Sequence, residues 1–274
     1  MLTRTLVDGA AQAQVRADDR GLLYGDGLFE TILVVHGRAP LWSRHMARLA
    51  DGCARLGLPI PDANVLTHEA SVVCAGMDRA VVRITITRGS GPRGYAPPAP
   101  TQPLRVVSAF PAPEIPPDWY HRGVRVCCCD LRLSTQPRLA GIKHLNRLEN
   151  VLARAEWSDA SITEGVLRDA DGCVISATAA NVFIVLGGRP VTPKLDRCGV
   201  AGVARAQVLA WREDVEVRDL TMDELMRADE LFLTNAVRGI VPVTALDDRC
   251  WQVGPVARDL QQRWDALFAA ERDA

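Results

Sequence analysis

The sequence has few of the features that mark nucleic-acid-binding, secreted or membrane proteins. It contains no run of about 18 apolar residues, which a transmembrane helix needs, and its first residues lack the apolar core and cleavage site of a signal peptide. Aromatic residues make up only 5% of the 274 residues and the formal net charge is −1. Neither base-stacking platforms nor a basic face is therefore expected. We expect a cytoplasmic protein that binds neither membranes nor nucleic acid.

Cysteine occurs eight times but never as a C-x-x-C pair. Residues 127–129 are three consecutive cysteines in a strand-like segment, an arrangement that suits neither a zinc site nor a disulfide framework. Disulfides are rare in reducing compartments. We therefore expect free buried thiols and no metal site.

Chain length and proline content suggest a division into two domains. A chain of 274 residues predicts one large or two modest domains. Four prolines lie in the stretch PAPEIPPD (111–118), and proline stiffens a chain and cannot supply the hydrogen-bond donors of a strand. We predict a smaller N-terminal domain over residues 1–112, a proline-rich linker over 113–121 and a larger C-terminal domain over 122–274.

Hydrophobic periodicity predicts both strands and helices. Apolar and polar residues alternate in three segments, which predicts strands over residues 81–89, 104–110 and 124–133. Helical spacing of apolar residues predicts helices over residues 43–58, 144–157, 202–213 and 255–271. Mixed elements in two lobes indicate an α/β or α+β enzyme-like architecture.

Lysine is scarce: of the 32 Lys and Arg residues, the only lysines are Lys143 and Lys194. Lys143 follows a glycine in GIKHLNRLENVL (141–152), at the predicted start of a helix. The helix dipole and the charge of Arg147 one turn on both disfavour an ammonium there and lower its pKa. A free amine is what Schiff-base formation requires. The alternative is a surface lysine at a helix end without a chemical role.

A Schiff-base lysine implies a carbonyl cofactor or substrate, and pyridoxal 5'-phosphate would also need a phosphate cradle. Glycines in the segment 198–210 precede a predicted helix whose first amides, on Val203 and Ala204, could point at an anion. The segment 232–239 offers a second set of free amides at a strand end. Each of these two segments alone also fits an ordinary helix cap or strand end. An arginine would be expected to pair with the phosphate, but the chain has too many arginines for the sequence to show which one.

Seven motifs together resemble the fold-type IV pyridoxal-phosphate enzymes. In chain order they are DDRGLLYGDGLFETI (18–32), RHMARL (44–49), RGSGPRGY (88–95), AGIKHLNRLENVLARAEW (140–157), AANVF (179–183), TPKLDRCGVAGVAR (192–205) and ADELFLTNAVRGIVPV (228–243). The third and fourth are most similar to the lyases that act on 4-amino-4-deoxychorismate. The resemblance implies a two-domain aminotransferase-like α/β fold, with the cofactor in the interdomain cleft, usually in a homodimer.

The resemblance also assigns cofactor contacts. Lys143 matches the lysine that binds the cofactor covalently, and Arg48 matches the arginine that bonds its phosphate. The remaining phosphate contacts match two segment ends, which carry Val203, Ala204, Asn235 and Ala236.

On the ring and substrate sides, the matches are fewer. Asn181 lies in the strand segment expected to pass beneath the cofactor ring, and Arg93 matches a loop arginine that could receive a substrate carboxylate. Tyr24 and Tyr95 could line the substrate side, although packing is a comparable role. His45 is expected on a helix surface or as a supporting group rather than as an acid or base.

One position departs from the family pattern. The family has a glutamate five residues before the asparagine of the AANVF segment, where it keeps the pyridine nitrogen protonated, and this chain has Ser176. A hydroxyl offers only a neutral hydrogen bond, worth about 1 kcal/mol. Asp169 and Asp171 are expected in a solvent-facing turn. The ring would then be a weaker electron sink, which impairs transamination more than an elimination that forms an aromatic ring.

The activity that the resemblance implies is a carbon–oxygen lyase reaction. It converts 4-amino-4-deoxychorismate to 4-aminobenzoate and pyruvate, a step of folate biosynthesis. One alternative is an aminotransferase of the same fold that acts on D-amino or branched-chain amino acids. A second alternative is a non-catalytic or weakly cofactor-binding member, because Ser176 replaces the usual glutamate.

Overall fold

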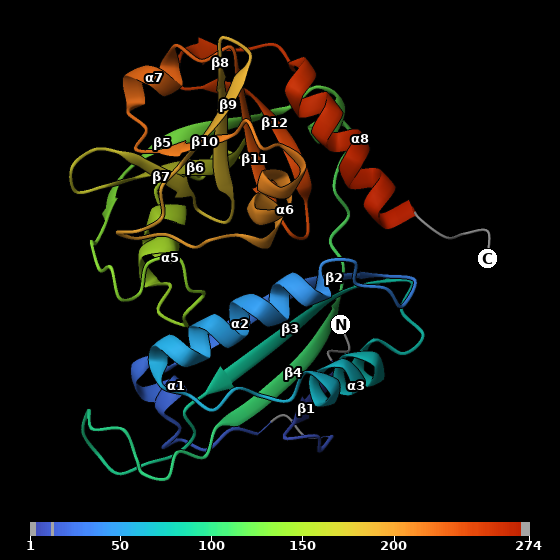
Figure 1. Ribbon diagram of the computed structural model, residues 1–274, viewed down its shortest axis with the longest axis vertical. Helices are drawn as coiled ribbons and strands as arrows, with labels where there is room; N and C mark the ends of the chain where they lie inside the picture. The colour runs from blue at the N-terminus through green and yellow to red at the C-terminus, as the bar shows by residue number, and fades with distance from the viewer. Residues whose placement is uncertain (1–3, 12–13, 270–274) are drawn as a thin grey trace. The chain divides into compact units, whose positions relative to one another are not determined.

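The computed structural model describes residues 4–11 and 14–269, and the chain divides into two compact units (Figure 1). Unit 1 consists of Met1–Pro113 and Ile142–Asn146, and unit 2 of Glu114–Gly141 and Arg147–Ala274. The sequence-based division differs at one segment, because residues 142–146 were expected in the C-terminal domain. The predicted linker holds a short helix, α4 (Pro117–His121), within unit 2.

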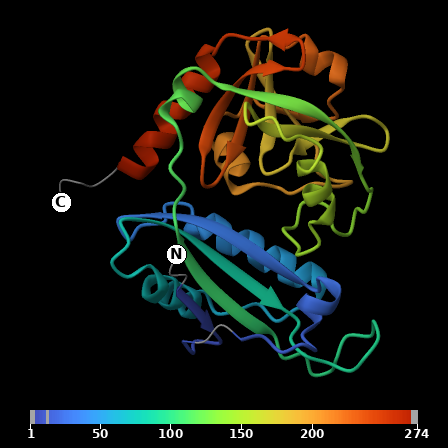
Figure 2. The same cartoon turned by 180° about the vertical axis from the view of Figure 1, so that it is seen from behind.

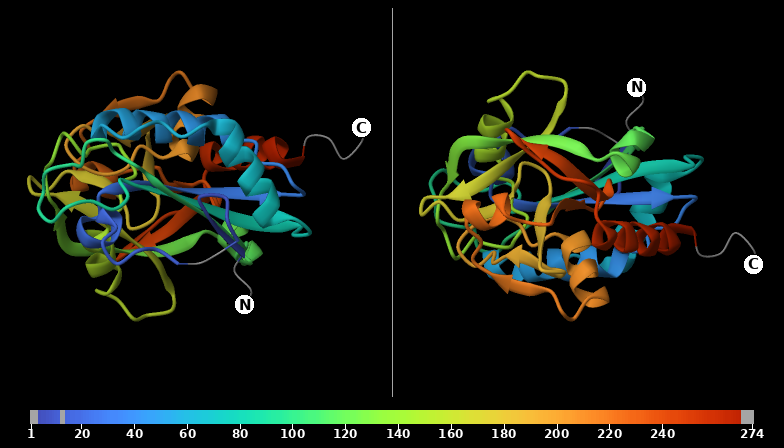
Figure 3. Two further views of the ribbon diagram at one scale, coloured as in Figure 1. Left: turned by 90° about the horizontal axis from the view of Figure 1, so that it is seen from below. Right: turned by 90° about the horizontal axis from the view of Figure 1, so that it is seen from above.

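Unit 1 is built on a four-stranded antiparallel sheet. In spatial order its strands are β1 (Arg4–Val7), β4 (Leu104–Pro111), β3 (Arg79–Thr87) and β2 (Gly27–Val35). Its helices are α1 (Arg20–Tyr24), α2 (Trp42–Leu56) and α3 (Ala63–Cys74). Helix α2 contacts β2, and α3 contacts β4 (Figures 1 and 3). The strands predicted over 81–89 and 104–110 and the helix predicted over 43–58 are confirmed.

Alternating burial shows which face of this sheet belongs to the core. Every second residue from Ala80 to Ile86 is at most 1% exposed, whereas the residues between them are partly buried. The antiparallel register places Glu30 opposite Ile84, on the buried face that α2 covers, and Phe29 opposite Thr85, on the other face. Side chains for chemistry are therefore available on the Phe29 face.

Unit 2 is built on a nine-stranded mixed sheet. Its strands in spatial order are β10 (Glu216–Arg218), β9 (Arg189–Pro193), β8 (Asn181–Leu186), β11 (Glu230–Asn235), β12 (Gly239–Leu246), β5 (Val124–Leu133), β6 (Ile162–Asp169) and β7 (Val174–Ala177), with β13 (Arg249–Cys250) paired to β12. The pairs β10–β9, β12–β5 and β5–β6 are parallel, and the other pairs are antiparallel.

Helices and aromatic packing complete unit 2. Besides α4, the helices are α5 (Leu148–Arg154), α6 (Val203–Trp211), α7 (Met222–Met226) and α8 (Pro255–Ala269). Helix α8 lies against β11 and β12 (Figures 1 and 2). In the core, the rings of Phe183 and Phe232 stack with their centroids 5.1 Å apart. The mixed strands and helices confirm the predicted fold class.

All eight cysteines are free. Cys53, Cys74, Cys129 and Cys198 are buried, and burial raises the pKa of Cys129 to about 12. The expectation that all the thiols are buried is wrong at Cys250, which is exposed. Within the described ranges, no helix is long and apolar enough to span a membrane.

Candidate functional site

Lys143 lies in an extended segment rather than at a helix start. Phe29 N donates to Lys143 O at 2.9 Å, and Leu145 N donates to Gly27 O at 3.0 Å. These bonds pair the segment 142–146 with β2, and α5 begins only at Leu148. The prediction that a helix dipole acts on Lys143 is therefore wrong, because backbone pairing with β2 overrides the local helical pattern. That pairing fixes the lysine backbone to a rigid sheet.

Two cations meet on one aromatic ring in unit 1. Lys143 Nζ lies 4.4 Å from the centroid of the Phe29 ring, and Arg83 Cζ lies 4.1 Å from the same centroid. Arg83 extends from the Phe29 face of β3, and burial lowers its pKa. Among the residues described, no carboxylate pairs with Arg83. A half-buried arginine beside a lysine is suited to bind an anion.

On the other face of the sheet, Glu30 joins two residues of α2. Arg48 Nε donates to Glu30 Oε1 at 2.8 Å, its Nη2 bonds Oε2, and His45 Nδ1 lies 2.6 Å from Oε2. Burial opposes ionisation of Glu30, but the charge of Arg48 and the bond from His45 outweigh it and lower its pKa. Burial also lowers the pKa of His45. His45 is 1% exposed, so the expected helix-surface position is wrong and its supporting role toward Arg48 and Glu30 is what the contacts show.

In unit 2, the start of α6 has the form of an anion cradle. Gly202 is the residue before the helix, and no side chain caps it. The first amides of a helix have no partners within the helix, so those of Val203 and Ala204 can bind an anion. Asn181 Oδ1 accepts from Gly202 N at 3.1 Å, and Asn181 Nδ2 donates to Val200 O at 2.9 Å. Both polar atoms of Asn181 thus hold the loop that leads into the helix.

Glycine is required at position 202 by this close approach. A Cβ atom there would lie 2.1 Å from Asn181 Oδ1. Any larger residue would displace either the asparagine or the start of α6.

Two further groups near this cradle lack negative partners. Thr234 pairs with Asn181 across β11 and β8, and its buried Oγ1 has no hydrogen-bond partner among the described residues. Arg205, in the first turn of α6, is 8% exposed and bonds Thr192 Oγ1 and Pro193 O. Burial lowers its pKa to about 10, and no carboxylate pairs with it in the described part of the chain. An anion such as a phosphate would satisfy these groups.

The turn from β11 to β12 contains the other two proposed phosphate contacts. Asn235 Oδ1 accepts from Val237 N at 2.8 Å and from Arg238 N at 3.2 Å. Its Nδ2 donates to Ala179 O. The asparagine side chain therefore shapes the turn.

Ser176 is buried on β7 opposite Leu167. Asp169 is fully buried, so the predicted solvent-facing turn is wrong for it. Its Oδ2 accepts from Arg197, and its Oδ1 accepts from two backbone amides. Glu164 is also buried, and it pairs with Arg238. These acids are committed to their own partners, which leaves the Ser176 position without a substitute acid among them.

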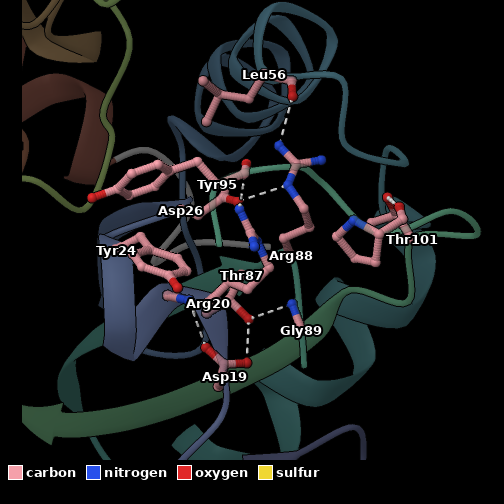
Figure 4. Close-up of polar contacts among 12 residues, drawn as sticks. Asp19, Arg20, Tyr24, Asp26, Leu56, Thr87, Arg88, Gly89, Tyr95 and Thr101 are labelled. Carbon is pink, nitrogen blue, oxygen red and sulfur yellow. Dashed lines mark hydrogen bonds and ion pairs between the residues drawn. The ribbon is translucent and has the colours of Figure 1, made fainter. Parts of the chain in front are cut away.

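The loop between β3 and β4 carries the proposed substrate arginine. Arg93 and Tyr95 are both exposed, and the rings of Tyr24 and Tyr95 lie 5.5 Å apart in an edge-to-face contact. Gly94 N donates to Tyr24 Oη at 3.3 Å. Tyr24 and Tyr95 therefore lie together on unit 1 (Figure 4), and Arg93 is two residues before Tyr95 in the same loop.

Sequence reasoning missed Arg83 and Arg205. In a chain with 32 Lys and Arg residues, the type of residue does not distinguish them. The strand register singles out Arg83, and the absence of a carboxylate partner among the described residues singles out both arginines.

The chain belongs to the amino-transferase class IV family, whose model matches residues 27–246. It is 36% identical to the aminodeoxychorismate lyase of Vibrio harveyi, over 88% of this chain and 90% of that protein. It is 33% identical to a putative branched-chain-amino-acid aminotransferase of Methanocaldococcus jannaschii, over 92% and 90%. The crystal structure of 4-amino-4-deoxychorismate lyase from Pseudomonas aeruginosa matches with a TM-score of 0.91 and 48% identity, over 94% of this chain and 97% of that chain.

Proposed function

We propose that the chain is a pyridoxal-phosphate-dependent lyase that converts 4-amino-4-deoxychorismate to 4-aminobenzoate and pyruvate. The observation that carries the proposal is Lys143, held by backbone pairing to β2 with its amine on the Phe29 ring, which Arg83 also contacts. Similarity to two proteins named as this lyase supports the choice of reaction.

Three side chains and four backbone amides are the proposed cofactor contacts. Lys143 would bind it covalently, Arg48 would bond its phosphate, and Asn181 would position the loop before α6. The phosphate would also accept hydrogen bonds from backbone amides of Val203, Ala204, Asn235 and Ala236. The uncapped helix start supports this assignment, as do the buried Arg205 and the Thr234 hydroxyl, which has no hydrogen-bond partner among the described residues.

The cofactor, when bound, would supply an electron sink. Lys143, released when the substrate amine takes its place, would act as the general base and remove the proton from the carbon that bears that amine. Loss of the enolpyruvyl group completes an aromatic ring and gives the elimination its driving force.

Two arginines are suited to the substrate carboxylates. Arg93 and Arg83 can each form a bidentate pair with a carboxylate, while Tyr24 and Tyr95 border the loop that carries Arg93. Ser176 would face the ring nitrogen with a neutral hydroxyl, which suits an elimination better than a transamination.

An aminotransferase is the second candidate, because the Methanocaldococcus jannaschii relative carries that name. The cofactor-loaded protein should be incubated separately with 4-amino-4-deoxychorismate and with an amino acid plus a 2-oxo acid. Pyruvate release in the first mixture supports the lyase. Formation of a new amino acid in the second, without pyruvate release in the first, shows an aminotransferase. Neither reaction, together with no cofactor absorbance, would indicate a non-catalytic member.

We also propose that the enzyme is a cytoplasmic homodimer of folate biosynthesis. Support for association comes from α5, where Leu148, Val151 and Leu152 form an apolar stripe and are each more than 50% exposed. Light scattering should give twice the mass of one chain.

A further inference from the structure

Two arginines in unit 1 share one carboxylate oxygen. Arg20 Nε donates to Asp26 Oδ2 at 3.0 Å, and Arg88 Nε donates to the same oxygen at 2.8 Å (Figure 4). Arg20 is 4% exposed and Arg88 is 7% exposed. Burial opposes ionisation of Asp26, but its bonds to Arg88 and Arg20 outweigh it, so its pKa is lowered. The carboxylate therefore stays charged and neutralises this pair of buried cations in part.

The two arginines differ in what their other nitrogens bind. Arg20 donates to Gly94 O at 2.9 Å and to Tyr95 O at 3.0 Å. Arg88 donates instead to Gly57 O at 3.1 Å and to Leu56 O at 2.8 Å, at the end of α2. Arg20 thus fixes the loop between β3 and β4, whereas Arg88 fixes a helix end.

The base of this loop is held by a second set of bonds. Thr87 Oγ1 donates to Asp19 Oδ2 at 2.7 Å and accepts from Gly89 N at 2.9 Å. Asp19 Oδ1 also accepts from Gly21 N at 2.8 Å, which caps α1. The backbone of Arg20 itself donates to Gly89 O at 2.9 Å. The start of α1, which carries Arg20, is therefore rigid.

The carbonyls that Arg20 binds immediately follow Arg93. The Arg93 side chain is exposed and has no hydrogen-bond or ion-pair partner among the described residues. Residues 89–94 contain three glycines, with φ values of +76° at Gly89 and +104° at Gly94, and one proline, so the backbone around Arg93 is less restricted than the proline-rich remainder of the loop. A flexible loop would lose conformational entropy on binding a substrate, which weakens affinity.

We propose that Arg20 is a positioning residue, which holds the loop so that Arg93 is placed in advance for a carboxylate of the substrate. This inference rests on the proposed function for the identity of the substrate. The ordering of the loop by Arg20 does not depend on it.

The test compares Arg20→Lys with Arg88→Lys in the cofactor-loaded protein. Each variant keeps a positive charge beside Asp26, but lysine cannot reach two carbonyls and the carboxylate together. Arg20→Lys should speed amide hydrogen exchange in residues 91–96. It should also raise KM for 4-amino-4-deoxychorismate about tenfold, the loss expected when a charge-assisted bond is no longer held in place, and change kcat by less than about twofold. Arg88→Lys should leave exchange in 91–96 and KM as in wild type.

A double-mutant cycle with Arg93→Gln isolates the coupling. Because Arg20 is proposed to act through Arg93, Arg93→Gln should raise KM by a smaller factor in the Arg20→Lys background than in wild type. Unchanged exchange in 91–96, equal effects of Arg20→Lys and Arg88→Lys, or strictly additive changes in the cycle would each overturn the proposal. If the wild type releases no pyruvate while Arg20→Lys still speeds exchange, the proposed function fails and the ordering role of Arg20 stands.

Discussion

Replacing Ser176 with glutamate introduces the acid that the resemblance to the fold-type IV enzymes implies at this position. Ser176 is 7% exposed and lies opposite Leu167, so a carboxylate there is buried in an apolar environment without cofactor. Keeping it neutral at pH 7, against an unfolded pKa of about 4.3, costs about 4 kcal/mol at 1.36 kcal/mol per unit. Folding raises the pKa of the introduced carboxyl group, so the loss of stability is absent below about pH 4 and grows as the pH rises.

Bound pyridoxal phosphate should reverse most of this loss. A cationic ring nitrogen beside the carboxylate shifts its pKa by about 1–3 units, or about 1.4–4 kcal/mol. Cofactor affinity should therefore rise between about tenfold and a thousandfold over Ser176→Gln, the neutral control of similar size. Urea unfolding at pH 5 and pH 8, with and without cofactor, measures the stability, and visible absorption follows the ring.

The reasoning fails on a specific pair of results. If Ser176→Glu unfolds at the same urea concentration as Ser176→Gln at pH 8 without cofactor, position 176 is not the apolar site described. If both variants also bind pyridoxal phosphate with equal affinity and the same spectrum, Ser176 does not face the ring nitrogen.

Three other predictions follow from the geometry. Gly202→Ala should weaken cofactor binding at least tenfold, because its Cβ would lie 2.1 Å from Asn181 Oδ1; a fluorescence titration with pyridoxal phosphate checks this. Arg205→Met removes a buried cation without a carboxylate partner, so the cofactor-free protein should unfold at an equal or higher temperature while cofactor affinity falls; a lower melting temperature contradicts it. The pKa values of His45 and Glu30 are both lowered in the folded protein. The stabilisation that each residue contributes therefore decreases as the pH falls. The decrease begins below about pH 6.5 for His45 and below about pH 4.3 for Glu30. In His45→Gln, unfolding measured between pH 7 and pH 5 should show a smaller loss than in wild type.

Local patterns predicted the regular elements well. The alternation in residues 81–89 corresponds to β3 because one face of that strand is buried and the other is not. The helix over 43–58 corresponds to α2 for the equivalent reason at helical spacing. Helix α2 begins after Leu41 without a side-chain cap.

Tertiary contacts decided what local patterns could not. The helix predicted over 144–157 begins only at Leu148, because the backbone of residues 143–145 pairs with β2, which is distant in the sequence. Arg83 is one arginine among many until the register of β2 and β3 places it on the face of Phe29. Asp169 is the last residue of β6 and not a turn residue, and Arg197 and two backbone amides hold it in the interior. Such pairings depend on which distant segments meet, and no single segment encodes them.

Pyruvate release from 4-amino-4-deoxychorismate tests the central claim most directly. The protein loaded with pyridoxal phosphate should release pyruvate and 4-aminobenzoate in equal amounts, and Lys143→Ala, loaded in the same way, should release neither above the uncatalysed rate. The account is contradicted if the loaded wild type releases no pyruvate, or if Lys143→Ala releases it at the wild-type rate.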